Sequence, residues 1–348
     1  MEKMKPSISV ILPVFNGAFY LNEAISSILQ QSYQDFELII INDGSTDDSG
    51  SIIEKYLTHD RRIRYFEKKV NSGLIDSLNF GISHAKGEYI ARMDADDISL
   101  SNRLAFQKKF LDDHQQMGVI GSNVHFINSS GKRISNFINN RTLPKTAQQI
   151  SWTMCFTNCL IHPTVMFRRE LIEREGGYSL SSLHAEDYDL WTRLLKVTHF
   201  YNLPQKLLLL RKHDKNVTVV HFDTTVSNSR RISSDYISSI LNLHTSDELV
   251  NLLWSAFPLN EQESSLLVGL FQDLYSKFIE LYLISTEDKN YIEKDIAHRI
   301  IELACRSQTS NDVQRFLYDE AKKIQKNEVI KFLLLHFLRE RWKQLKHV

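Results

Sequence analysis

The stretch Gly87–Asp97, GEYIARMDADD, decides how the rest of the chain is interpreted. Its apolar part, YIARM, has the composition of a buried strand, and three carboxylates, Asp94, Asp96 and Asp97, follow. Side chains alternate along a strand, so Asp94 and Asp96 are predicted to point the same way at its carboxyl end. Like charges repel at this spacing, which favours a hard divalent cation bound by carboxylate oxygens. The alternative is a solvated acidic loop that caps a helix beginning near Ser99.

Strand-like and helix-like segments alternate up to this stretch. Continuous apolar runs predict strands, and apolar residues at helical spacing predict a helix after each of the first three. The predicted strands are Ile8–Val14, Phe36–Ile41, Ile63–Phe66 and Tyr89–Met93. This alternation is typical of a doubly wound, Rossmann-like, mostly parallel α/β sheet. Ligands of such sheets bind where the strands end, so Asn16, Asp43 and the Asp94/Asp96 pair are predicted to meet at one edge.

Further elements follow the acidic stretch. The predicted strands are Val119–Asn128, Thr164–Phe167 and Lys206–Leu210, and the predicted helices are Leu104–His114, Lys145–Cys155 and one from His184 to about Lys196. From about Thr225 only helical periodicity is found, with Leu266, Leu270, Leu274 and Phe278 on one line. We therefore predict two domains, residues 1–224 and an all-helical region, residues 225–348. Ser45 and Asp48 resemble a cap for the helix that follows the second strand.

The composition excludes several classes of protein. The 348 residues contain 42 Lys+Arg and 42 Asp+Glu, so no basic field indicates a nucleic-acid partner. Cys155 and Cys159 have helical spacing, but with Cys305 as the third cysteine no second pair completes a zinc site. All three are interpreted as buried thiols in a reducing compartment. Without a signal-peptide pattern or an apolar run of ~20 residues, we expect a cytoplasmic protein that at most lies on the inner face of the cell membrane.

Seven pieces of the chain, in order over roughly residues 7–216, resemble the inverting family-2 glycosyltransferases. They are VILPVFNG (Val10–Gly17), INDGSTDDS (Ile41–Ser49), NSGL (Asn71–Leu74), GEYIARMDADD, HPTVMFRR (His162–Arg169), AEDYDLW (Ala185–Trp191) and Arg211–His213. The resemblance implies a GT-A fold and transfer of a sugar from a nucleotide sugar, with UDP expected. Many members build bacterial polysaccharide, O-antigen or capsule, which implies a glycan acceptor, expected to be lipid-linked. The helical region beyond Thr225 is not covered.

The resemblance also implies which residues bind the donor. Pro13, Val14 and Phe15 would shape the nucleoside pocket, and Asn71 is carried over from NSGL. Asp43 would accept a hydrogen bond from the uracil imide; the structural alternative is an Asx turn that holds its own loop.

Near the diphosphate, Asp94 would lie by the ribose. Asp96 would ligate Mg²⁺ or Mn²⁺, which offsets charge on the departing UDP. His213 matches a position that contacts the metal or diphosphate, and an imidazole ligand would favour Mn²⁺. Arg92 would assist the leaving group, or form an ion pair with Asp94, whose strand face it shares.

Asp187 matches the general base of the family. Inversion requires a carboxylate that takes the proton of the acceptor hydroxyl as its oxygen attacks C1. Adjacent helical residues point about 100° apart, so Glu186 is expected to support Asp187 or to bind the acceptor. The alternative is a helix that begins with favourable acidic residues.

The region that would carry the QxxRW signature of processive members has no such motif, so we expect the enzyme to add one sugar or a few. Two other functions fit the sequence less well. A sugar-phosphate nucleotidyltransferase would need a basic, Gly-rich first loop, which VFNGAFYLNEA is not. A non-catalytic nucleotide- or glycan-binding protein would be expected to lack the acidic residues that are present here.

The end of the chain, Lys331–Val348, has the pattern of a basic amphipathic helix. Its five basic residues are Lys331, Arg339, Arg341, Lys343 and Lys346, and its one acidic residue is Glu340. Such a helix can lie in an anionic membrane interface. Packing on neighbouring helices or on a second subunit is the alternative, because the apolar residues do not form one narrow stripe.

Overall fold

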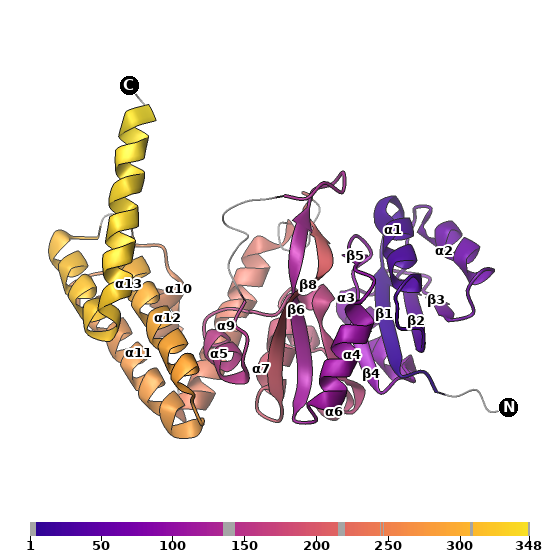
Figure 1. The fold of residues 1–348 in the computed structure, drawn as a ribbon, viewed down its shortest axis with the longest axis horizontal. Coiled ribbons are helices and arrows are strands. Elements are labelled where there is room, and N and C mark those ends of the chain that lie inside the picture. The colour runs from indigo at the N-terminus through magenta and orange to yellow at the C-terminus, as the bar shows by residue number, and fades with distance from the viewer. Residues whose placement is uncertain are drawn as a thin grey trace. The chain divides into compact units, whose positions relative to one another are not determined.

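The computed structural model describes residues 5–134, 143–214, 220–243, 245, 247–306 and 309–346, with side chains as far as Phe332. The chain divides into two compact units, Met1–Ser229 and Arg230–Val348, each of which is described by itself (Figure 1). This boundary and the predicted one, between residues 224 and 225, both fall within helix α9 (Phe222–Leu241).

The first unit is built on one mixed, mostly parallel sheet with the strand order β3-β2-β1-β4-β7-β6-β8-β5. Its strands are β1 (Ile8–Val14), β2 (Phe36–Asn42), β3 (Ile63–Glu67), β4 (Tyr89–Arg92), β5 (Ile98–Ser99), β6 (Met117–Ile127), β7 (Met166–Arg168) and β8 (His199–Arg211). Its helices are α1 (Ala18–Leu29), α2 (Ser49–Leu57), α3 (Leu74–His84), α4 (Arg103–Asp113), α5 (Ala147–Thr153), α6 (Arg169–Arg174) and α7 (Glu186–Leu194). The first four strands are those that the apolar runs predict.

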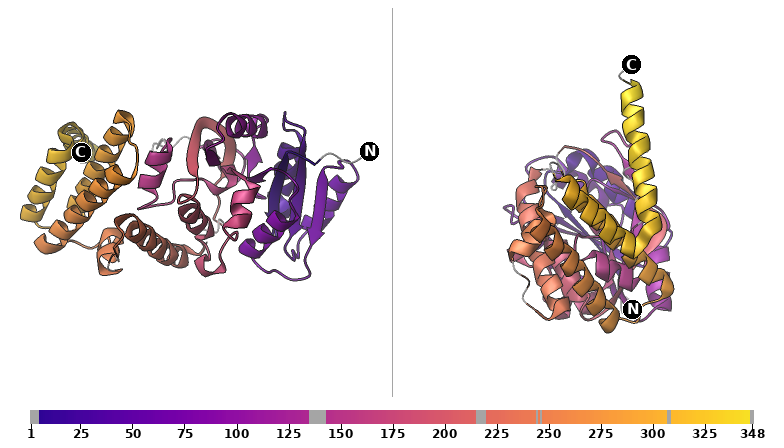
Figure 2. Two further views of the ribbon diagram at one scale, coloured as in Figure 1. Left: turned by 90° about the horizontal axis from the view of Figure 1, so that it is seen from below. Right: turned by 90° about the vertical axis from the view of Figure 1, so that its left-hand side faces the viewer.

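Helices cover both faces of the sheet (Figure 2). Leu12 of β1 shares a buried cluster with Ile25 of α1. The next-door residue Ile11 points to the opposite face, where Gly81 of α3 lies so close that a Cβ there would be 2.7 Å from the Ile11 side chain. Alternation along β1 therefore buries both sides of the strand. This arrangement confirms the doubly wound α/β class.

Strand register places the acidic loop beside the end of β1. In the parallel pairing, Arg92, the last residue of β4, is opposite Ile11, and the Met93 N–H donates to the Ile11 carbonyl. Strand β4 thus ends three residues before β1, whose last residue, Val14, is opposite Asn42. The chain that follows β4 runs past the end of β1, and Ala95 comes close to Gly17 there. The loops after β1, β2 and β4 consequently share one edge of the sheet.

Several predicted bounds were wrong. Strand β8 begins at His199 rather than Lys206, because it pairs in parallel with β6 along nearly its whole length. Near Ser99 the chain forms β5 against β8, and α4 begins only at Arg103. Thr164 lies in a short 3-10 helix before β7, rather than in the strand. The Ser45–Asp48 cap of α2 is absent: Ser45 Oγ accepts the Asn16 N–H instead.

The second unit is helical where it is described, as the sequence predicts. Its helices are α10 (Asp247–Trp254), α11 (Glu261–Leu281), α12 (Thr286–Ala304) and α13 (Asn311–Lys346). Leu270, Leu274 and Phe278 of α11 are buried, but Leu266, predicted on the same line, is 52% exposed. Cys305 is exposed, which corrects its interpretation as a buried thiol; Cys155 and Cys159 are buried.

Helix α13 leaves helical geometry at Gln325 (φ −146°, ψ 80°), and its last part projects away from the other helices of this unit (Figures 1 and 2). The side chains beyond Phe332, on which the predicted membrane contact depends, lie outside the described residues. Among the helices of the described ranges, none is long and apolar enough to cross a membrane.

Candidate active site

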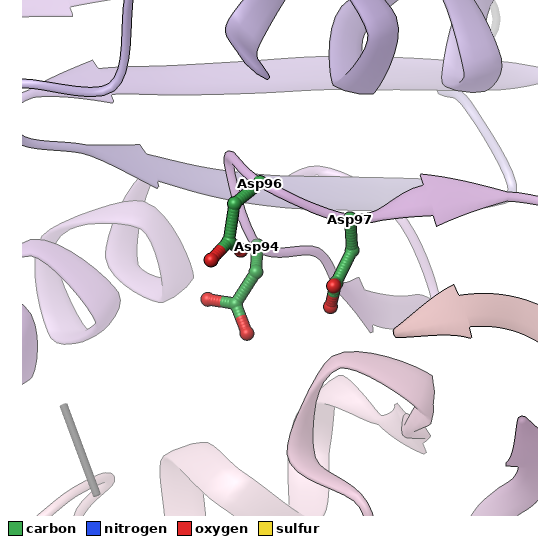
Figure 3. A group of neighbouring side chains, drawn as sticks. All are labelled: Asp94, Asp96 and Asp97. Atoms are coloured by element: carbon green, nitrogen blue, oxygen red, sulfur yellow. The ribbon is translucent and has the colours of Figure 1, made fainter. Parts of the chain in front are cut away.

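The three carboxylates of the acidic loop gather at the end of β4. Asp94, Asp96 and Asp97 each offer an oxygen, and these oxygens lie within 4.8 Å of one another (Figure 3). Asp97, to which the sequence assigned no role of its own, is 1% exposed. Its Oδ1 accepts the Arg211 N–H at 2.8 Å, while its Oδ2 is buried without a hydrogen-bond partner among the described residues. Asp97 was thus predicted as a member of the acidic stretch, but its burial and its contact with Arg211 were not.

The negative charges of the three carboxylates repel one another. Burial, the first cause, and the neighbouring charges of Asp94 and Asp96 raise the pKa of Asp97 well above its ordinary value. Burial also raises the pKa of Asp94, although Arg92 acts in the opposite direction. A cation among the three oxygens would offset this repulsion. Carboxylate oxygens are the ligands that Mg²⁺ and Mn²⁺ prefer, so the donor set fits the predicted metal.

Arg92 lies beneath the loop with 3% of its surface exposed and forms an ion pair with Asp94. This is the structural alternative that its strand face predicts. Its Nε is buried without a hydrogen-bond partner in the described parts of the chain. The Asp94 charge raises the pKa of Arg92 against the effect of burial, so the guanidinium remains charged. Arg92 thus supplies a fixed, buried positive charge next to Asp94.

His213, which follows the end of β8, is brought to the acidic loop as expected. Its Nε2 lies 2.8 Å from Asp96 Oδ2, and its ring stacks on Tyr20 of α1 at a centroid distance of 5.4 Å. The two residues predicted to contact the metal, 117 positions apart in sequence, are therefore neighbours. Their role as ligands remains a prediction.

Asp43, at the end of β2, holds the loop that follows β3. Its carboxylate accepts the Ser72 and Gly73 N–H groups and the Ser72 hydroxyl at 2.8–3.1 Å, and Lys68 Nζ lies 3.1 Å away. These hydrogen bonds keep the pKa of Asp43 below its ordinary value in spite of burial. Asp43 therefore stabilises the loop at Ser72 and Gly73, rather than forming an Asx turn in its own loop.

Asn71, which is also predicted to bind the nucleotide-sugar donor, lies in the loop that Asp43 holds. Asn71 is exposed and its Oδ1 accepts the Gly73 N–H at 2.8 Å. Gly44 has φ +70°, and a Cβ on it would lie 2.6 Å from the Val70 carbonyl carbon, so only glycine allows the two loops to approach this closely.

Pro13 and Val14 form the end of β1, opposite Ile41 and Asn42. Phe15 follows them with half of its surface exposed, outside the hydrophobic core. The sequence thus identified residues that gather at one edge of the sheet. Their contacts with a nucleoside remain a prediction.

Two acidic residues begin helix α7. Asp187 Oδ2 accepts from the Asn158 amide at 2.7 Å, and its Oδ1 accepts the Tyr188 N–H at 2.7 Å. Burial raises the pKa of Asp187, and the two hydrogen bonds lower it. Glu186 is 7% exposed, and burial together with the Asp187 charge raises its pKa to about 7. Asn158, 29 residues earlier, carried no signal in the sequence, because only the fold brings it to Asp187.

The raised pKa of Glu186 has a consequence for stability. Between its ordinary value of 4.5 and about 7, the folded state binds a proton that the unfolded state has released. The free energy of unfolding should therefore fall as pH rises through this window. Glu186→Gln, which stays neutral, should remove this dependence and raise stability at pH 8 by at most about 3 kcal/mol. Urea unfolding at pH 5 and pH 8 measures it, with the exposed Glu54→Gln as control. Equal pH dependence in Glu186→Gln and the wild type would contradict it.

The fold is a doubly wound α/β sheet with an acidic cluster at the edge where such sheets bind ligands. Comparison with known proteins identifies the class as a glycosyltransferase and gives the family. The chain matches Glycosyl transferase family 2 over residues 9–176. It is 35% identical to the O-antigen biosynthesis glycosyltransferase WbnJ of Escherichia coli, over 60% of this chain and 81% of WbnJ. The chain therefore belongs to glycosyltransferase family 2. It is also 28% identical to the bifunctional glycosyltransferase pgtA of Dictyostelium discoideum over 88% of its length, but spans only 44% of that relative.

Solved structures resemble the chain in fold. S. aureus TarS 1–349 in complex with UDP-GlcNAc superposes with a TM-score of 0.55 at 18% identity, covering 92% of each chain. The mannosyltransferase PcManGT from Pyrobaculum calidifontis, in complex with GDP-Man and Mn²⁺, gives a TM-score of 0.50 at 17% identity over 94% of this chain and 86% of that one. At these identities the likeness shows the fold alone, and it confirms the predicted GT-A class.

Proposed function

We propose that this chain is an inverting, metal-dependent, non-processive glycosyltransferase that moves a hexosyl or N-acetylhexosaminyl group from a UDP-sugar to a glycan hydroxyl. The observation that carries the proposal is the acidic loop: three carboxylates and His213 meet at the carboxyl end of β4, where ligands of such sheets bind. The names of the similar proteins support the donor class, since TarS was solved with UDP-GlcNAc and PcManGT with GDP-Man and Mn²⁺.

The acidic loop would hold the metal through Asp96, with Asp94, Asp97 and His213 around it. Mg²⁺ or Mn²⁺ bound there supplies Lewis-acid stabilisation of the diphosphate leaving group. Asp43 would face the uracil, with Pro13, Val14, Phe15 and Asn71 around the nucleoside. Because four protein donors already surround the Asp43 carboxylate, its contribution to uracil binding is expected to be indirect, through the loop at Ser72 and Gly73.

Asp187 would act as the general base. The Asn158 amide and the Tyr188 N–H fix its carboxylate in one orientation, as a base aimed at a substrate hydroxyl requires. The carboxylate takes the proton of the acceptor hydroxyl while that oxygen forms a bond to C1. The bond from C1 to the diphosphate oxygen breaks, and the electron pair leaves with UDP. Glu186, with a pKa of about 7, would bind the acceptor or support the base.

The biological setting is proposed from the relatives. WbnJ is named for O-antigen biosynthesis, which supports a role in surface polysaccharide synthesis. We propose a lipid-linked acceptor with that role. A cytoplasmic location, with the C-terminal helix on the inner face of the membrane, would suit that acceptor. Membrane contact remains a prediction, because the side chains it depends on lie outside the described residues.

A donor panel tests the proposed function. UDP-glucose, UDP-galactose, UDP-GlcNAc, UDP-GalNAc and GDP-mannose are incubated with the full chain, and nucleoside diphosphate release is measured with Mn²⁺, with Mg²⁺ and with EDTA. We expect slow, metal-dependent hydrolysis of one UDP-sugar in the absence of acceptor. Hydrolysis of GDP-mannose alone would contradict the UDP donor, and absence of both hydrolysis and nucleotide binding would contradict the enzyme proposal.

A further inference from the structure

Arg211, the last residue of β8, forms hydrogen bonds to the acidic loop. Its N–H donates to Asp97 Oδ1 at 2.8 Å, and its Nε donates to the Asp96 carbonyl at 2.7 Å. Its Nη1 contacts the carbonyls of Asn128 and Ser129 at 3.3 Å, and only 1% of its side chain is exposed. The guanidinium is therefore enclosed in protein and fixes both the backbone at Asp96 and one oxygen of Asp97.

Helix α1 supplies the other half of the environment of Arg211. Glu23 forms an ion pair with the Arg211 Nη2, and the Tyr20 ring lies under the guanidinium, 4.3 Å from its central carbon. Tyr20 and Glu23 are three residues apart, so they lie on the same face of the helix. One face of α1 thus contacts the Arg211 guanidinium, and Arg211 in turn forms hydrogen bonds to the acidic loop.

The same Tyr20 ring also orients His213. The two rings stack at 5.4 Å with an interplanar angle of 22°, and in this orientation the Nε2 of His213 reaches Asp96 Oδ2 at 2.8 Å. A side chain that packs at once on Arg211 and on His213 couples the loop to the imidazole. Loss of the ring would remove this packing support from the imidazole beside Asp96.

We propose that Tyr20 and Glu23 are positioning residues of the metal site, which act through Arg211 and His213 and so set the affinity of the acidic loop for a divalent cation. The inference rests on the metal role proposed above for Asp96. Residues that orient the ligands of a metal typically change its affinity by about 10–100-fold when they are replaced. The competing explanation is that both side chains only pack α1 against the sheet, which would affect stability and leave metal affinity unchanged.

Mn²⁺ binding to the full chain in the presence of UDP tests the proposal without any turnover. Electron paramagnetic resonance follows the free ion during a titration. Tyr20→Leu and Glu23→Gln are each expected to weaken Mn²⁺ binding by about 10-fold or more. Tyr20→Phe, which keeps the ring, should bind as the wild type does. Phe19→Leu is the matched control, because Phe19 lies on the same turn with 84% of its surface exposed and meets only the edge of the Tyr20 ring among the described aromatic residues.

The outcomes separate this inference from the proposed function. Asp96→Ala should lose Mn²⁺ binding altogether, so wild-type affinity in both Tyr20→Leu and Glu23→Gln alongside that loss would overturn the positioning role alone. No Mn²⁺ binding by the wild type would overturn the metal role and this inference with it. Glu23 is 57% exposed, so Glu23→Gln is expected to fold and decides the question if Tyr20→Leu does not.

Discussion

Asp187→Asn is expected to lower the turnover number by roughly 10²–10⁴-fold, the usual contribution of a general base. The substitution keeps the shape of the side chain and removes the proton acceptor. The donor should bind as before, because Asp187 belongs to the acceptor side of the reaction in the proposed mechanism. Measured rates of UDP-sugar transfer, together with the KM for the donor, would show a loss in turnover at nearly constant donor KM.

The surroundings of Asp187 require a control for structure. Its two oxygens accept from the Asn158 amide and from the Tyr188 N–H, whereas an asparagine has only one oxygen. One donor therefore loses its acceptor, at a cost of about 1–3 kcal/mol in stability. Asn158→Ala also leaves Asp187 with one hydrogen bond, but keeps the base. It should lose much less activity than Asp187→Asn at a similar cost in stability.

The pH dependence distinguishes Asp187 from Glu186. A base must be deprotonated, so activity should rise with pH through the pKa of the catalytic carboxylate, which burial raises for both residues. If Asp187 is the base, Glu186→Gln keeps an acid limb in the profile, because the carboxylate that must lose its proton is still present. Near-normal turnover in Asp187→Asn, with loss in Glu186→Gln, would move the base to Glu186.

The sequence predicted those parts of the fold that are locally determined. Strands β1 to β4 are short, mostly apolar runs that are followed by polar residues, and their ends locate Asp43 and Asp94 on one edge of the sheet. Strand β8 was found only in part, because Asn202, Pro204 and Gln205 interrupt its apolar pattern. Its pairing with β6, an element some eighty residues earlier, supplies the missing stabilisation.

The site was predictable to the same degree. Motif order brought Asp96 and His213 into one hypothesis, and the structure brings them within hydrogen-bonding distance. Contacts between distant segments could not be read locally: Asn158 reaches Asp187, and Glu23 reaches Arg211 across 188 positions. The hydrogen bond that Asp97 accepts likewise comes from Arg211 of β8, and nothing in the DADD stretch indicates it.

Removal of the metal ligand is expected to have an effect as large as removal of the base. Asp96→Ala should lower transfer by roughly 10³-fold or more, since a bound cation contributes several kcal/mol to stabilising the leaving group. Excess EDTA should do the same to the wild type, and added Mn²⁺ should restore the wild type but not Asp96→Ala. Asp113→Ala, an exposed carboxylate on α4 paired with Lys109, is the matched control and should retain full activity.

Asp97 allows a finer test of the same cluster. Its Oδ1 accepts the Arg211 N–H, and its Oδ2 is buried without a hydrogen-bond partner among the described residues. Asp97→Asn can keep the first contact through its amide oxygen while it places an amide NH₂ where Oδ2 was. If Oδ2 faces the cation, this variant should require a higher Mn²⁺ concentration for half-maximal activity, at an unchanged donor KM under saturating metal. If the cluster is instead only a solvated acidic loop, Asp97→Asn removes repulsion and should stabilise the protein without altering its response to Mn²⁺, and full activity of the wild type in EDTA would accompany that result.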